Sequence, residues 1–213
     1  MMEDGEKERI PLLVVFSGPS GVGKDTVIQA VKASGFDIHH VVTATTRPPR
    51  ATETHGIDYY FVSPERFAEM IAGNQLLEHA EVHGYRYGTP VEEVRSAFDR
   101  GQDALLKIDV QGGLQVKRRL PQAVFVFLAP PSREDLLARL QSRKTESPEE
   151  LERRTSDAQF ELSQRNSYDY EIVNQPGNVE EAARQLKAII VAEKLKIYRQ
   201  PIDLGRTNPE EDH

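Results

Sequence analysis

Short apolar runs alternate with longer amphipathic segments along most of the chain. The apolar runs occupy residues 12–17, 104–108, 123–128 and 170–173, and turn residues bound them. Uninterrupted apolar runs of this length are typical of strands buried on both faces of a parallel sheet. The alternation therefore predicts an α/β fold in which helices connect the strands of a mostly parallel sheet.

The segments between these runs carry helix start signals. Ser63 precedes Pro64 ahead of an amphipathic stretch, an arrangement that favours a helix start. Thr89 precedes Pro90 in the same way, with Glu92 three positions after the predicted cap. The predicted helices begin at Ser63, Thr89, Ser132 and Ser147, one runs through Val27 and Val31, and the last spans residues 179–196.

Residues 43–88 break this alternation. The segment is rich in Thr, Arg, Tyr and Gly, and it predicts short strands with one helix in an inserted subdomain. Residues 1–10 and 199–213 are polar or charged. We therefore expect two flexible tails around a single domain of residues 11–198.

The composition restricts the class of protein further. The chain of 213 residues has no cysteine, which excludes disulfides, thiol catalysis and cysteine-ligated zinc. Its formal net charge of −7 argues against non-specific binding to nucleic acid or acidic membranes. The longest apolar run, residues 12–16, is too short to span a bilayer. These features predict a cytoplasmic protein without nucleic-acid or membrane partners.

A candidate phosphate-binding loop directly follows the first predicted strand. The sequence GPSGVGK at residues 18–24 lets successive backbone N–H groups turn toward phosphate oxygens, and Lys24 has the spacing to reach the β- and γ-phosphates of ATP. The alternative is a tight glycine turn without a ligand, but the flanking strand and helix favour nucleotide binding. The predicted ATP-binding residues are Gly18, Pro19, Ser20, Gly21, Val22, Gly23, Lys24, Asp25 and Thr26.

Asp25 departs from the usual motif, which has Ser or Thr at this position. A carboxylate is a hard oxygen ligand for Mg²⁺ or for a metal-bound water, so Asp25 is the candidate metal residue. It also brings negative charge close to the triphosphate. Thr26 still offers a hydroxyl one residue further on.

Two arginines stand close together in the sequence TTRPPR at residues 45–50. Arg47 and Arg50 could take a phosphate by paired hydrogen bonds, which suits a monophosphate acceptor. Taken alone, a solvated basic turn explains the pair equally well.

This run is one of a dozen motifs by which the chain resembles the guanylate kinases, in the family's own order. They include GPSGVGK at 18–24, TTRPPR at 45–50, GIDYYFVS at 56–63, YGTP at 87–90, IDVQG at 108–112 and FLAPPS at 127–132. The resemblance implies a three-layer P-loop kinase fold with a parallel sheet, an inserted mixed α/β GMP-binding subdomain and a helical lid. On this pattern the insert is residues 45–92, the lid is residues 136–162, and the core comprises residues 11–44, 93–135 and 163–198.

The resemblance also implies roles for the matched residues. The GMP phosphate would be held by Arg47, Arg50, Tyr59 and Tyr87, with Glu53 nearby, and the guanine site would be lined by Thr43, Glu78, Thr89 and Asp109. Arginines of the lid would surround the transferred phosphoryl group with positive charge and exclude water. The implied catalytic residues are Lys24, Arg47, Arg139, Arg143 and Arg154.

Glu78 also suits guanine on chemical grounds. Guanine presents N1–H and an exocyclic amino group as adjacent donors, which one carboxylate accepts together, whereas adenine has a lone pair at N1. Such a mismatch with buried polar groups can discriminate by ~10⁴-fold.

We therefore expect ATP-dependent phosphorylation of GMP and dGMP, with Mg²⁺, by a monomer or homodimer. The acceptor phosphate is already anionic, so positioning and charge carry the reaction without a general base. One alternative is a kinase of another phosphorylated small molecule, such as ribose 1,5-bisphosphate, which has no use for a carboxylate that reads guanine. The other is a phosphopeptide-binding module, which need not keep Lys24 or the lid arginines.

A second departure accompanies Asp25. Lys107 stands two residues before Asp109, where the guanylate kinase pattern is often acidic. One position gained a negative charge and the other lost one. We therefore hypothesise a compensated exchange in which Lys107 offsets Asp25 by direct pairing or through the local field. The alternative is that Lys107 points to solvent.

Overall fold

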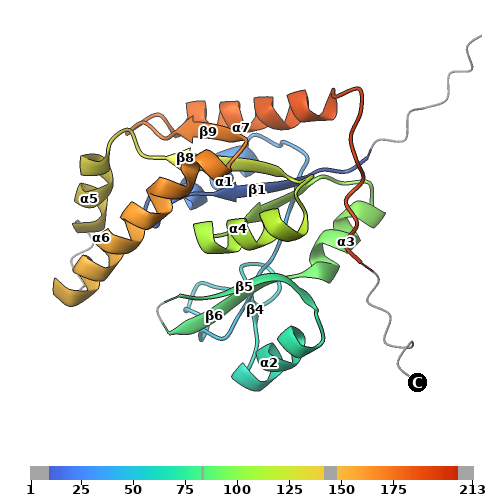
Figure 1. Cartoon of the computed structure of the whole chain (residues 1–213), viewed down its shortest axis with the longest axis horizontal. Helices are drawn as coiled ribbons and strands as arrows, with labels where there is room; N and C mark the ends of the chain where they lie inside the picture. The colour runs from blue at the N-terminus through green and yellow to red at the C-terminus, as the bar shows by residue number, and fades with distance from the viewer. Residues whose placement is uncertain (1–9, 83, 142–147, 206–213) are drawn as a thin grey trace, which may run out of the picture.

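The computed structural model describes residues 10–82, 84–141 and 148–205 and contains a central five-stranded parallel sheet (Figure 1). All the predicted apolar runs form strands of this sheet, within one or two residues of the predicted ends. In spatial order the strands are β2 (His39–His40), β7 (Ala104–Lys107), β1 (Leu13–Ser17), β8 (Val124–Ala129) and β9 (Tyr170–Val173).

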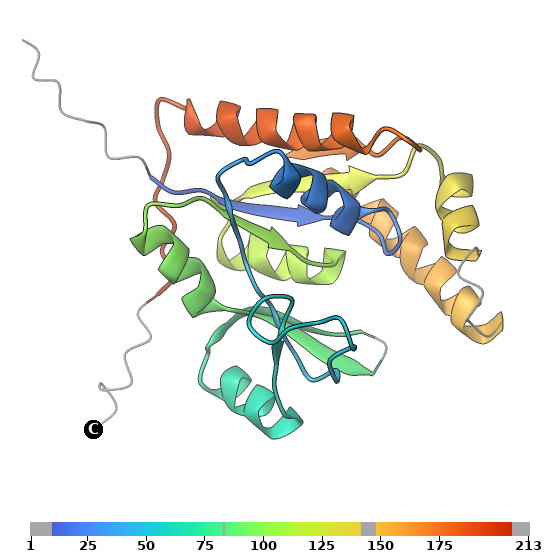
Figure 2. The same cartoon turned by 180° about the vertical axis from the view of Figure 1, so that it is seen from behind.

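Helices cover both faces of the sheet, which gives three layers (Figures 1 and 2). The helices α1 (Lys24–Ala33) and α7 (Val179–Lys194) pack on one face, and α3 (Val91–Asp99) and α4 (Val110–Arg119) pack on the other.

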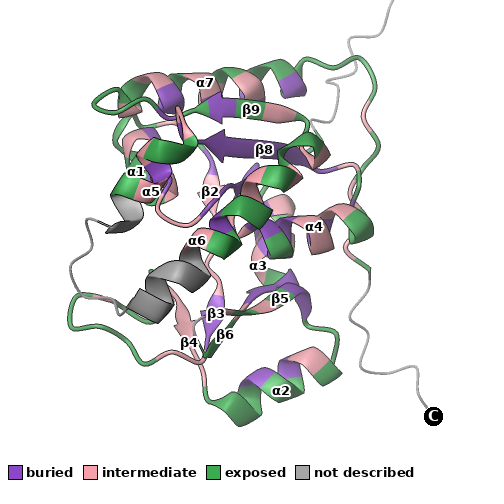
Figure 3. Ribbon diagram, turned by 60° about the vertical axis from the view of Figure 1, so that its left-hand side comes forward, coloured by how far each residue is buried: buried purple, intermediate pink, exposed green. Residues whose placement is uncertain are grey.

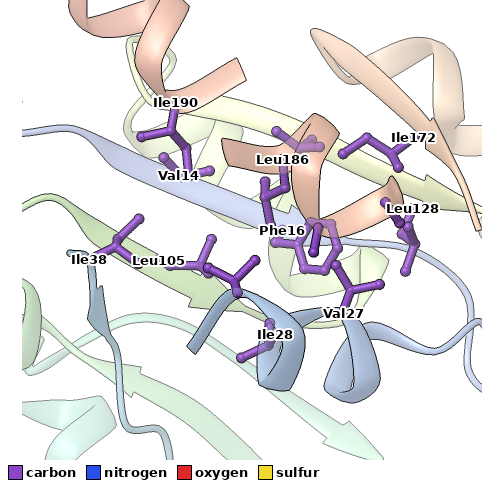
Figure 4. Close-up of a cluster of buried hydrophobic side chains, with 14 of the residues drawn as sticks. Val14, Phe16, Val27, Ile28, Ile38, Leu105, Leu128, Ile172, Leu186 and Ile190 are labelled. Carbon is purple, nitrogen blue, oxygen red and sulfur yellow. The ribbon is translucent and has the colours of Figure 1, made fainter. Parts of the chain in front are cut away.

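Alternate residues of β1 face opposite layers because side chains alternate along a strand. Val14 and Phe16 pack with α1 and α7, as Figure 4 shows, whereas Leu13 and Val15 pack with α3 and α4. All four side chains are fully buried, so the run predicted to be apolar on both faces forms the centre of the core.

A second, mixed sheet lies below the first and holds most of the predicted insert. Its order is β4 (Tyr60–Phe61), β3 (Ala44–Thr45), β6 (Tyr85–Pro90) and β5 (Leu76–Val82). β3 pairs in parallel with β4, whereas β6 is antiparallel to both β3 and β5. The helix α2 (Pro64–Ala72) packs on this sheet through Phe67 and Met70.

The helix start signals differ in outcome. Ser63 caps α2, because its hydroxyl accepts a hydrogen bond from the Arg66 N–H at 3.2 Å. Thr89 does not cap α3, which begins at Val91 with no side-chain cap; Thr89 lies in β6. The prediction of a Thr89 cap is wrong because its hydroxyl donates across the sheet to the Glu78 carboxylate instead.

Two further helices stand at one end of the molecule, in the predicted lid. They are α5 (Arg133–Gln141) and α6 (Pro148–Ser163), and a 3₁₀ turn at Gln164–Ser167 follows them. The Ser132 hydroxyl accepts a hydrogen bond from the Asp135 N–H at 3.0 Å, which confirms the predicted helix start there. The predicted start at Ser147 lies outside the described residues.

The segment after α7 differs from the flexible tail that its composition suggests. Residues 199–205 run back along the core, where Ile202 and Leu204 pack against the cluster beneath α3. Arg199 pairs with the Glu193 carboxylate, which is buried among Tyr170, Lys196 and Arg199. Two apolar side chains and one buried acid therefore fix a segment that is polar on average. Residues 1–9 and 206–213 lie outside the described residues.

The helices in the described part of the chain are too short or too polar to cross a membrane.

Candidate active site

The phosphate loop has the strand–loop–helix context that its sequence predicts. It leaves β1 after Ser17 and enters α1 at Lys24. Gly18 and Gly23 adopt positive φ values of 147° and 104°, which side-chain-bearing residues rarely adopt. A Cβ atom on Gly18 would also lie 2.2 Å from the Leu128 carbonyl oxygen of β8. The glycines therefore let the loop bend closely against the sheet.

The Lys24 ammonium lies across the mouth of this loop. Its Nζ donates to the carbonyl oxygens of Gly18 at 2.5 Å and Pro19 at 3.1 Å. Burial lowers the pKa of Lys24, and the nearby Glu161 carboxylate opposes that shift. Glu161, on α6, also accepts a hydrogen bond from the Ser20 N–H at 3.1 Å. A carboxylate of the lid thus accepts the hydrogen bond of one of the loop amides.

A cavity of about 610 Å³ opens between the phosphate loop and the second sheet. It brings together five of the nine residues predicted to bind GMP and three of the nine predicted to bind ATP. The predicted residues that line it are Ser20, Lys24, Asp25, Thr43, Tyr59, Glu78, Tyr87 and Asp109.

Glu78 is a buried carboxylate of this cavity, with 5% of its surface exposed. It lies in β5, a strand that is buried along part of its length (Figure 3). Its Oε1 accepts a hydrogen bond from the Thr89 hydroxyl at 2.6 Å. Gly112 leaves room for the other oxygen, since a Cβ there would lie 2.6 Å from Oε2. Burial raises the pKa of Glu78 to about 7, and the charge of Asp109 adds to that shift. The carboxyl therefore titrates close to neutral pH.

Asp109 lies at the N-terminus of α4 and caps it. Its Oδ1 accepts a hydrogen bond from the Gly112 N–H at 2.7 Å. Since Asp109 also lines the cavity, the cap fixes the carboxylate beside Glu78 at the predicted base site.

Arg47 is held at the edge of the second sheet by Glu53. Its Nη2 donates to both Glu53 oxygens, at 2.8 and 2.9 Å, and the guanidinium lies 5.5 Å from the ring centroid of Tyr59. The Arg47 guanidinium in turn lowers the pKa of Glu53. Tyr59 and Tyr87 meet edge to face with centroids 6.0 Å apart. Arg47, Tyr59 and Tyr87 therefore form one cluster.

Arg50 and Glu53 stand apart from the cavity wall. The Arg50 side chain is 75% exposed, although its backbone N–H donates to Glu53 Oε2 at 2.8 Å. Neither these two residues nor Arg47 and Thr89 are among the residues lining the cavity. Glu53 instead binds Arg47 and the Arg50 backbone, so its contacts are those of a residue that positions the arginines.

A second cavity, of about 790 Å³, lies on the other side of the phosphate loop. The loop contributes Gly21, Gly23 and Thr26, and the segment after β9 contributes residues 174–177. Asn174 joins the two segments, because its Nδ2 donates to the Val22 carbonyl oxygen at 2.8 Å. Lys24 and Asp25 line both cavities, so they mark the place where the cavities meet.

Sequence reasoning missed two parts of this arrangement. Residues 174–177 follow β9, and the carboxyl ends of parallel strands meet at one edge, so topology could have placed them beside the loop. Glu161 and its bond to the loop depend on how α6 packs, for which the sequence carries no signal. The described residues contain no group of three or more acidic or histidine side chains placed to hold a metal ion.

The predicted lid arginines are not tested. Arg143 lies outside the described residues, and the side chains of Arg139 and Arg154 lie outside the described part of α5 and α6. Their assignment stays a prediction.

Comparison with known proteins gives the same family from two directions. The family model described as guanylate kinase matches residues 11–193. A guanylate kinase of Clostridium perfringens is 41% identical over 213 residues, covering 100% of this chain and 98% of the relative. One from Bacillus subtilis is 46% identical over 194 residues, covering 91% and 94%.

The chain belongs to the guanylate kinase family. A solved guanylate kinase from Anaplasma phagocytophilum has the same fold, with a TM-score of 0.71, 33% identity and 90% of each chain covered. The family's enzymes are nucleoside monophosphate kinases that use ATP to phosphorylate GMP. The predicted fold class, enzyme class and reaction are thereby confirmed, and the sugar-phosphate and phosphopeptide alternatives are set aside.

Proposed function

We propose that the two cavities hold the two nucleotides of the guanylate kinase reaction. ATP would occupy the cavity bounded by the phosphate loop and residues 174–177, and GMP the cavity between the loop and the second sheet. The observation that carries this assignment is that Lys24 and Asp25 line both cavities. A phosphoryl group passing from one nucleotide to the other would cross at these residues.

The guanine base of GMP would bind at Glu78. Its carboxylate can accept from both N1–H and the exocyclic amino group, while the Thr89 hydroxyl holds Oε1 and the cap at Asp109 fixes a second acceptor nearby. Thr43 lines the same cavity and would add a hydroxyl.

The GMP phosphate would bind at the cluster of Arg47, Tyr59 and Tyr87, with Arg50 reaching in from the exposed edge. A guanidinium held by a carboxylate is already oriented, so less side-chain freedom is lost when it takes a phosphate. The lid arginines Arg139, Arg143 and Arg154 would complete the charge around the transferred group.

In the reaction a GMP phosphate oxygen forms a bond to the γ-phosphorus of ATP as the bond from that phosphorus to the bridging β–γ oxygen breaks, which leaves GDP and ADP. Lys24 would stabilise the charge that develops on the transferred group, and Arg47 would hold the acceptor oxygen in line. No proton must be removed from the acceptor at neutral pH, so no general base is assigned.

Mg²⁺ suits the residues at the junction. Protein-bound Mg²⁺ commonly has one or two carboxylates, with waters and substrate phosphates completing its shell. The Asp25 carboxylate fits that pattern because its side chain is 80% exposed at the junction of the cavities, and Thr26 lies beside it. The ion would neutralise phosphate charge, and Asp25 and Thr26 would hold it.

The direct test measures ADP formation with each nucleoside monophosphate in turn. We expect turnover with GMP and dGMP and little with AMP, CMP or UMP. ATP turnover that is independent of any acceptor would contradict the proposal. The cytoplasmic location, the monomer or homodimer state and the absence of nucleic-acid partners stay predictions of the sequence.

Replacing Glu78 with Gln should reduce the preference for GMP over AMP, measured as the ratio of kcat/KM, by on the order of 10²-fold or more. The reason is that the amide presents a donor as well as an acceptor to the base edge. An unchanged ratio would remove Glu78 from the base site.

Stability provides the control for the Glu78→Gln variant. The folded pKa of about 7 lies above the ordinary value of 4.5, so the contribution of Glu78 to stability is present below pH 4.5 and is lost as pH rises through 7. At pH 8 the variant should therefore unfold at higher denaturant concentration than the parent, which separates loss of specificity from loss of folding.

The affinity for GMP should fall as pH drops below about 7, because the Glu78 carboxyl then binds a proton and loses an acceptor. Calorimetric titration of GMP between pH 8 and pH 5.5 measures this dependence. The GMP phosphate also titrates, with a second pKa of roughly 6. The Glu78→Gln variant has no carboxyl at position 78, so its pH profile measures the contribution of the phosphate. Identical pH profiles for parent and variant would contradict the prediction.

A further inference from the structure

Asp25 and Lys107 form a direct ion pair. The Lys107 Nζ lies 2.6 Å from Asp25 Oδ1, although 82 positions separate the two residues in the sequence. Asp25 belongs to the first turn of α1, and Lys107 is the last residue of β7, opposite Phe16 of β1. The carboxyl end of β7 thus delivers an ammonium to the start of α1. Of the arrangements that the sequence left open, direct pairing is the one observed.

The pair stands where the two cavities meet. Asp25 lines both cavities, and Lys107 lines the cavity between the loop and the second sheet. The Lys107 Nζ also lies 5.9 Å from the ring centroid of Tyr59. The Lys107 side chain therefore contacts Asp25 and also lies near Tyr59, which belongs to the cluster with Arg47.

The charges around the pair are mostly negative. The described residues that line the first cavity include two ammonium groups and six carboxyl groups, namely those of Lys24, Lys107, Asp25, Glu78, Glu81, Asp109, Asp157 and Glu161. Without the Lys107 ammonium, the negative charge of Asp25 would repel the phosphates that the loop must hold.

We propose that Lys107 neutralises Asp25 and so preserves the affinity of the phosphate loop for nucleotide phosphates, with the two residues working as one unit. This inference rests on the proposed function of the loop. It makes Lys107 a positioning residue: it acts through Asp25, whose carboxylate it holds at the junction and whose charge it cancels. It also predicts an asymmetry. Without Mg²⁺, removal of the Lys107 ammonium should weaken ADP binding, whereas removal of the Asp25 carboxylate should change it little.

A double-mutant cycle of Asp25→Asn, Lys107→Met and the double variant tests the pair, with Lys107→Arg as the charge-retaining control. The readout is the affinity for ADP by calorimetry, first in EDTA and then in Mg²⁺. In EDTA we expect Lys107→Met to weaken ADP binding by about 10-fold or more and Asp25→Asn to weaken it by less than about 3-fold. The affinity of the double variant should recover to within about 3-fold of the parent. Lys107→Arg should bind nearly as the parent does.

Divalent cation and salt extend the test. Mg²⁺ should reduce the loss in Lys107→Met, because the ion supplies the charge that the ammonium supplied. The loss should also shrink as salt screens the negative charge of Asp25. If Lys107 had only a structural role, neither Mg²⁺ nor salt would change the loss of ADP affinity in Lys107→Met.

Two results would overturn the proposal. One is parental ADP affinity in Lys107→Met. The other is a double variant as weak as Lys107→Met alone, which would mean that Lys107 acts independently of Asp25. If Lys107→Met unfolds, Lys107→Gln repeats the cycle with a polar side chain. The measurement needs no acceptor, so a parent protein that binds ADP but fails to phosphorylate GMP would contradict the proposed function and not the ion pair.

Discussion

Replacing Lys24 with Ala should lower kcat by on the order of 10²-fold or more, while the fold stays intact. The ammonium spans the loop mouth between the carbonyl oxygens of Gly18 and Pro19, at the residue pair that lines both cavities. It is therefore placed to stabilise the negative charge that develops on the phosphoryl group during transfer. The loop backbone also has hydrogen bonds that do not involve this ammonium: the Val22 N–H donates to the Pro19 carbonyl oxygen, and Asn174 Nδ2 donates to the Val22 carbonyl oxygen.

Lys32→Ala is the matched control, since Lys32 is an exposed residue in the last turn of the same helix. Single-turnover kinetics with saturating ATP and GMP measure the chemical step in both variants. Near-parental turnover of a folded Lys24→Ala variant would contradict the phosphate-loop assignment.

Replacing Arg47 with Ala should weaken the affinity for GMP by on the order of 10²-fold and change the affinity for ATP by less than about 2-fold. Arg47 follows β3 of the second sheet, and Glu53 fixes its guanidinium beside Tyr59, which lines the first cavity and not the second. The expected split follows from this one-sided position. Separate calorimetric titrations of GMP and of ATP measure the two affinities.

Two other variants qualify the Arg47→Ala result. Arg47→Lys keeps the charge but loses the planar fork, so its GMP affinity should lie between those of the parent and Arg47→Ala. Arg66→Ala changes an exposed arginine of α2 that pairs with Glu69, and it should leave both affinities unchanged. An equal loss of ATP and GMP affinity in Arg47→Ala would show that the two-cavity assignment is wrong.

Much of the core could be predicted from sequence because its strands are apolar on both faces. Residues 13–17 and 124–129 have no polar face that a different register could expose, so their burial follows from composition alone. The phosphate loop could be predicted equally well, since its glycines and lysine have a fixed spacing between a strand and a helix. Pairing of Asp25 with Lys107 could be anticipated only because both residues depart from a known pattern.

Other features depend on contacts between distant segments and were not predictable from local sequence. Thr89 has the neighbours of a helix cap, but a buried carboxylate across the sheet competes for its hydroxyl. Residues 199–205 are polar on average, yet Ile202 and Leu204 find the apolar surface near α3. The contact between Glu161 and the Ser20 amide likewise exists only once α6 is packed in place.

The central position of β1 has a consequence for synthesis on the ribosome. Both neighbours of β1, namely β7 and β8, come later in the chain by roughly 90 residues or more. At ~5–20 residues per second, translation leaves the apolar β1 segment without its sheet partners for roughly 4–20 s. During that interval the β1 segment, which is fully buried in the folded protein, is available to chaperones and to aggregation, and the loop that β1 anchors has no sheet to bend against. The nucleotide site therefore assembles late, because residues 174–177 also line it and most of the chain must be made first.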